Sequence, residues 1–143
     1  MKLFKRKMGK KQKAALNALA EGIECGAKLR PQCQMGLMQP IDREQNYGSC
    51  ALGAAAECAL VKQGVQIDAS AIELIRQTGY DEILAAYGVM NRVGLNYITV
   101  EDGRGNQVRV ADDNADIAGL IWHLNDWQLW TRERIAAFLR ELE

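Results

Sequence analysis

Residues 49–63 read SCALGAAAECALVKQ, and this stretch decides the fold. From Cys50 to Gln63, apolar residues occupy almost the whole circumference of a helix, which predicts a buried central helix. Ser49 is expected to be its N-cap, and Gly64 fits the position just after its C-terminus. The small residues at 53–56 and 59 predict that neighbouring helices approach it closely. The stretch therefore favours a mainly α fold.

Further helices are predicted on both sides of this stretch. Apolar residues at i, i+3, i+4 and i+7 predict a helix over residues 10–27. Shorter helices are expected over residues 68–77, with Asp68 as N-cap, and over residues 81–87. Another is expected at about 114–124, capped by Asp112 or Asp113, and a last one follows the N-cap Thr131.

Two segments between these helices have other patterns. Strand-forming residues at about 96–101 and 106–110 flank a turn sequence and predict a β-hairpin. Residues 30–48 have no period, which indicates an irregular connection, one long enough to be functional or to contain a short element. The predicted fold class is thus mainly α, a compact bundle of about five helices with one β-hairpin.

The charge of the chain is unevenly distributed. The first 13 residues contain seven of the 18 basic side chains and no acidic one, namely Lys2, Lys5, Arg6, Lys7, Lys10, Lys11 and Lys13. The other 130 residues hold 11 basic and 18 acidic side chains, a net charge of −7. We therefore divide the chain into a basic arm, residues 1–13, and a single helical domain, residues 14–143. The arm is expected to bind a polyanion, an acidic protein face or a second copy of the domain, unless it is simply a solvated tail.

The sequence also bears on the compartment. No apolar run approaches the roughly 18–20 residues that cross a bilayer, so no membrane partner is expected. Lysines at 10–13 occupy the place where a signal peptide needs its apolar stretch. Without an export signal, the four cysteines are expected to be reduced thiols in a cytoplasm.

A Gly-Ser-Cys sequence at the start of the central helix, five residues after Gln45, resembles the nucleophile region of papain-like cysteine peptidases. A thiol at a helix N-terminus can become a thiolate more easily, which makes Cys50 the candidate nucleophile of a small cysteine hydrolase. Such a site needs a histidine base from a later strand. His123 is the only histidine and falls within a predicted helix. We therefore expect no enzyme activity and keep the hydrolase as the alternative.

Neither a metal nor a cofactor is expected. Cys50 and Cys58 lie on one helix about 12 Å apart along its axis, too far for one tetrahedral ion. The acidic cluster at 112–116 lacks the spacing of a calcium loop, so helix capping explains it better. Trp122 lies beside the apolar stripe of its helix. It is expected either to cover the hairpin or to be an exposed anchor for a partner or a second subunit.

Three stretches resemble a family of small uncharacterised proteins from bacteriophages and prophages. They are LAEGIECGAKLRPQ at 19–32, SCALGAAAE at 49–57 and HLNDWQLWTRERIAAFL at 123–139. The resemblance carries over no functional residue, and residues 65–110 have no counterpart in it. It implies a phage setting, in the host cytoplasm or the virion. There the expected function is that of a non-enzymatic accessory protein that binds a macromolecular partner: a virion component, a nucleic acid or a host-defence target.

Overall fold

The computed structural model of the chain describes residues 9–91, 98–101, 107–111 and 116–142. Within these ranges the fold is mainly α, with six helices and two antiparallel strand pairs, which confirms the predicted class. The elements in chain order are α1 (Lys10–Ala27), β1 (Met38–Pro40), β2 (Tyr47–Ser49), α2 (Ala51–Lys62), α3 (Ala69–Gln77), α4 (Tyr80–Ala86), β3 (Ile98–Glu101), β4 (Gln107–Ala111), α5 (Ile117–Asp126) and α6 (Arg132–Glu141).

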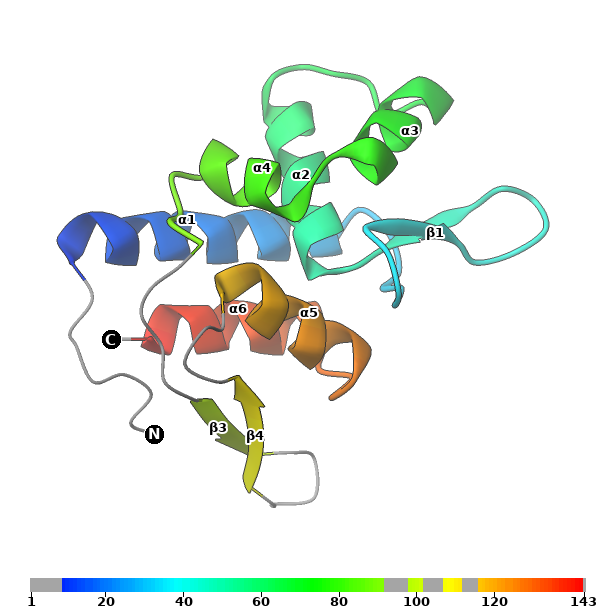
Figure 1. Cartoon of the computed structure of the whole chain (residues 1–143). Helices are drawn as coiled ribbons and strands as arrows, with labels where there is room; N and C mark the ends of the chain where they lie inside the picture. Colours follow the sequence, from blue (N-terminus) through cyan, green and yellow to red (C-terminus); the bar gives the residue numbers. More distant parts are fainter. Residues whose placement is uncertain (1–8, 92–97, 102–106, 112–115, 143) are drawn as a thin grey trace.

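The long helix α1 runs across the molecule, with α2 packed on one side and α6 on the other (Figure 1). Its predicted apolar face is buried at Leu16, Leu19, Ala20 and Ile23, whereas Ala27 at its end is partly exposed. Helix α5 packs against both α2 and α6, so these four helices enclose the core. The shorter α3 and α4 pack on α2.

Helix α2 is the central helix that the sequence predicted. Leu52, Ala54 and Ala55 have almost no exposed surface. A Cβ added to Gly26 of α1 would lie 1.9 Å from the Ala54 carbonyl oxygen, and one added to Gly53 would lie 1.9 Å from the Leu37 carbonyl oxygen. The predicted close approach of neighbours to α2 is therefore confirmed.

The helix caps correct two expectations. Cys50, not Ser49, is the N-cap of α2: its sulfur accepts a hydrogen bond from the Gly53 amide at 3.3 Å. Ser49 is extended and belongs to β2, where it pairs with Met38. The side chain of Asp116 caps α5, whereas Asp112 and Asp113 lie outside the described residues.

The other two predicted caps are confirmed. Asp68 accepts from the Ala71 amide at 3.0 Å, and Thr131 accepts from the Arg134 amide at 3.1 Å. The predicted hairpin corresponds to β3 and β4. Residues 30–48 are long enough to contain a short element, and the structure has one there: strands β1 and β2 pair with each other. This pairing continues through an isolated bridge between Gln32 and Ser49.

Candidate interaction surface

A buried amide joins three distant parts of the chain where α5 ends. Asn125 is 1% exposed, and its Oδ1 accepts from the Gln32 side chain at 2.9 Å and from the Ala51 amide at 3.2 Å. Its Nδ2 donates to the Cys33 carbonyl at 2.9 Å and to Asp126 Oδ1 at 2.7 Å. Since the amide uses both of its acceptor sites and both of its donors, it fixes the end of α5 against the start of α2.

A buried guanidinium completes this polar centre from the other side. Arg132, 5% exposed, donates to Ser49 Oγ at 2.7 Å and to the Ser49 carbonyl at 3.3 Å. It also donates to the carbonyls of Arg30 at 2.8 Å and Ala27 at 3.2 Å, where α1 ends. A cation is favourable there because the helix C-terminus carries unsatisfied carbonyls and partial negative charge. Burial lowers the pKa of the Arg132 guanidinium from its ordinary value.

Three stretches that lie far apart in the sequence, 19–32, 49–57 and 123–139, meet at this centre. Gln32 comes from the first stretch, Ser49 from the second, and Asn125 and Arg132 from the third. Their side chains are engaged in hydrogen bonds within the fold. These four residues therefore build the scaffold.

The surroundings of Cys50 do not favour the hydrolase alternative. Its side chain is buried, and burial raises the pKa of the thiol to about 12, a larger effect than the opposing hydrogen bond from the Gly53 amide. His123 contacts Gln128, with 3.2 Å between the side-chain nitrogens, and does not line the space beside Cys50. Among the described residues, the arrangement therefore offers Cys50 no histidine base, and its thiol is not accessible.

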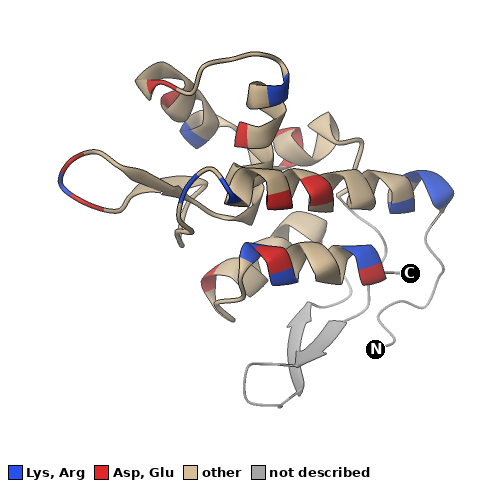
Figure 2. Cartoon of the chain, turned by 180° about the vertical axis from the view of Figure 1, so that it is seen from behind, with Lys and Arg blue, Asp and Glu red and all other residues tan. Residues whose placement is uncertain are grey.

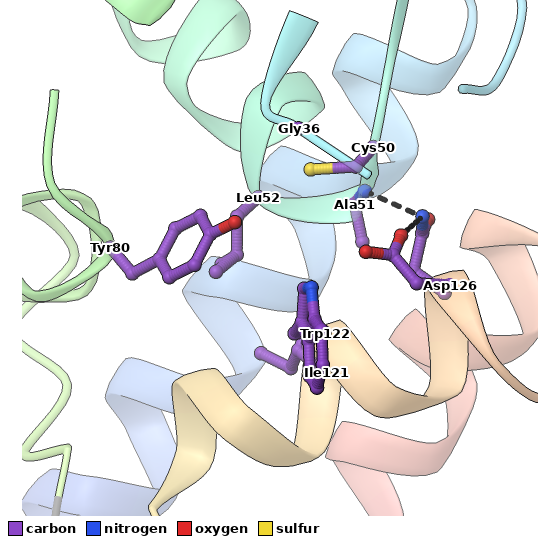
Figure 3. Close-up of a pocket in the computed structure, with 9 residues that line it drawn as sticks. Gly36, Cys50, Ala51, Leu52, Tyr80, Ile121, Trp122 and Asp126 are labelled. Carbon is purple, nitrogen blue, oxygen red and sulfur yellow. Dashed lines mark hydrogen bonds between the residues drawn. The ribbon is translucent and has the colours of Figure 1, made fainter. Parts of the chain in front are cut away.

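The space beside Cys50 is a cavity of about 10 Å³. In Figure 3 the Cys50 sulfur, the Tyr80 hydroxyl and the Asp126 carboxylate point toward it, with Trp122 below. This volume accommodates about one water molecule and no substrate. Among the described residues, no group of three His, Cys, Asp or Glu side chains is placed to hold a metal ion.

Large apolar side chains are exposed next to this centre. Trp122 on α5 is 37% exposed, and Trp127, just after α5, is 60% exposed. Their ring centroids are 6.1 Å apart with the planes at 77°, an edge-to-face pair. Leu129 follows, 66% exposed and with a positive φ of 55°. We call Trp122, Trp127 and Leu129 the aromatic patch.

Trp122 is thus partly exposed, and its expected role, as a cover for the hairpin or as an anchor for a partner, stays a prediction. Sequence reasoning missed Trp127 and Leu129, because they follow α5 in a connection that has no period. The available signal was composition: three large apolar residues, two of them tryptophans, occur in residues 127–130 between two helices, and only Trp130 is buried.

Of the basic side chains assigned to the arm, Lys2, Lys5, Arg6 and Lys7 fall outside the described residues. The exposed Lys10 and Lys11 form the basic start of α1, whose second half carries acids (Figure 2). Lys13 instead donates to the carbonyls of Arg140 and Leu142 at the end of α6.

The residue between these lysines is also part of the fold. Gln12 is buried and exchanges two 2.8 Å hydrogen bonds with the backbone of Met90. The helical body therefore uses residues 12 and 13, which the sequence had assigned to the arm. Lys10 and Lys11 also belong to α1, so the arm proper ends before residue 10.

Comparisons with family models, with curated proteins and with solved structures find no match. In the described part of the chain, no helix has the length and apolar character needed to span a membrane.

Proposed function

We propose that this protein acts without catalysing a reaction, by binding another protein through the aromatic patch. The observation that carries the proposal is the pair of exposed tryptophans, Trp122 and Trp127, packed edge to face at the end of α5. Tryptophan is the side chain most enriched at binding hot spots, because it buries a large area with little loss of conformational freedom.

The scaffold beneath the patch supports this proposal. The hydrogen bonds of Asn125 hold the end of α5, so the backbone that carries Trp122 is held in place. A preorganised surface loses less entropy on binding than a mobile one. The burial of Cys50 removes the main reason to prefer an enzyme. The resemblance to phage and prophage proteins suggests a bacterial host cytoplasm or a virion as the setting, with a virion component or a host-defence protein as partner.

A nucleic-acid partner is the second candidate, because Lys10 and Lys11 are exposed and continue the basic run of residues 2–7. Its test is binding of purified RNA or DNA at increasing salt. If several phosphates are contacted, log K falls with log salt by roughly 0.7–0.9 per contact. Binding that is undetectable at about 50 mM salt would exclude this candidate.

The protein-binding proposal is tested by capture from host and virion extracts with the full chain as bait. Trp127→Ala is expected to lose the specific partner, whereas Leu74→Ala, which removes a 58% exposed side chain from α3, is expected to keep it. A hot-spot tryptophan is worth at least about 2 kcal/mol, which corresponds to a loss of roughly 30-fold in affinity. Equal capture by both variants would refute the role of the patch.

A further inference from the structure

The aromatic patch and the N-terminal residues have complementary chemistry. We propose that the patch of one copy binds residues 1–8 of a second copy, so that the protein self-associates through its arm. This inference rests on the proposed function, because it names the partner of the same patch.

The patch is apolar, and the segment of chain that carries it, residues 110–131, provides no lysine or arginine. Asp126, the last residue of α5, is 9% exposed, and one of its buried carboxylate oxygens finds no hydrogen-bond partner among the described residues. Exposed Asp81 and Glu82 follow Tyr80, which lines the same cavity as Trp122. Burial lowers the pKa of His123, so that its ring is neutral at pH 7.

Residues 1–8, MKLFKRKM, carry both cations and apolar side chains. They contain four cations, Lys2, Lys5, Arg6 and Lys7, together with the apolar side chains of Met1, Leu3, Phe4 and Met8. Cations are attracted to tryptophan faces, and apolar side chains gain by covering exposed rings. The protein already makes such a contact: the Arg134 guanidinium lies 3.7 Å from the centre of the Trp130 ring.

Geometry favours a second copy as the donor of the arm. The arm joins the start of α1, whereas the patch lies toward the other end of that helix, as Figure 1 and the bond from Gln32 to Asn125 indicate. The 18 residues of α1 span about 27 Å. Eight residues extend over at most about 26–29 Å, so the arm of the same chain would have to be almost fully stretched around the body.

The experiment is sedimentation of the full chain over a range of concentrations. We expect reversible self-association that weakens with salt, since the arm contributes charge. Trp127→Ala should weaken it at least ten-fold, and Leu74→Ala should leave it unchanged. A full-length arm variant with four neutral substitutions should sediment as a monomer: Lys2→Gln, Lys5→Gln, Arg6→Gln and Lys7→Gln.

A labelled peptide of residues 1–9 gives an independent measurement. We expect it to compete with self-association and to show saturable fluorescence polarisation with the four-substitution variant, which still carries the patch. Trp127→Ala introduced into that variant should weaken peptide binding at least ten-fold, and Leu74→Ala should not.

Three results would overturn the inference. A full-length protein that stays monomeric up to several hundred micromolar would do so, even if the peptide binds, because the arm would then not join two copies. Self-association that persists in the arm variant, or that Trp127→Ala leaves unchanged, would place the interface elsewhere. Lastly, if a monomeric protein captures another partner through Trp127, the proposed function stands and this inference fails.

Discussion

Replacing Arg132 by methionine tests whether the buried polar centre holds the fold together. The substitution keeps a long apolar side chain and removes donors that reach Ser49 Oγ at 2.7 Å and the Arg30 carbonyl at 2.8 Å, besides weaker contacts to Ala27. The acceptors remain buried without this partner, and each such loss costs about 1–3 kcal/mol. Removing the buried cation relieves part of its desolvation penalty.

From the two short bonds and this partial compensation, we expect Arg132→Met to lower the free energy of unfolding by about 3 kcal/mol. Against a typical total of about 5–15 kcal/mol, this is a large fraction of the stability. For a chain of this size it corresponds to a fall in Tm of about 10 °C. Arg132→Lys keeps the charge but not the planar fork, so it should recover only part of the loss.

Urea unfolding followed by far-UV circular dichroism measures this difference. Arg140→Met is the matched control on the same helix. Its ion pair with Glu24 is between partly exposed side chains and contributes at most about 1 kcal/mol. If Arg132→Met unfolds within 1 kcal/mol of the wild type, or costs no more than the control, the structural role assigned to the guanidinium is wrong.

Three other predictions concern the thiols, the helix crossing and pH. Iodoacetamide at pH 7–8 should leave Cys50 of the native protein unmodified, because burial raises the pKa of its thiol to about 12. The half-buried Cys25 should react first, and equal alkylation rates of Cys25 and Cys50 by mass spectrometry would contradict this. Gly26→Ala should cost about 1–3 kcal/mol in urea unfolding, because its Cβ would overlap a backbone carbonyl of α2, whereas Gly9→Ala meets no atom within 4 Å and should be nearly neutral. Burial lowers the pKa of His123, so the unfolded chain takes up a proton at a higher pH than the folded protein, and stability should fall as pH drops below about 6.5. His123→Gln should remove that part of the pH dependence of the thermal melts. An unchanged pH profile in this variant would contradict the role of His123.

The fold was predictable where its causes are local. The spacing of apolar residues predicts α1 at residues 10–27, and the nearly closed apolar circumference of α2 predicts its burial. Asp68 and Thr131 cap helices as expected, because a capping side chain bonds to an amide only three residues away.

The candidate surface was only partly predictable. Trp122 was identified by its place beside the apolar stripe, which periodicity reports directly. Trp127 and Leu129 lie outside any period, so nothing local distinguishes them from the buried Trp130. Their exposure follows from how α6 packs after the connection, which a local pattern does not contain.

The sequence by itself thus determined the helices, most of their ends and the separation of a basic arm from an acidic body. Only the tertiary structure decided which polar residues are buried together. Arg132 reaches Ser49 across 83 residues, and Asn125 reaches Ala51 across 74. A contact of the same kind tied Lys13 to the end of α6, and the pairing of Ser49 with Met38, beyond one helical turn, made Ser49 a strand residue rather than a cap. Periodicity and capping depend on neighbours within about one turn of helix, whereas these bonds depend on how the packed helices bring distant residues together.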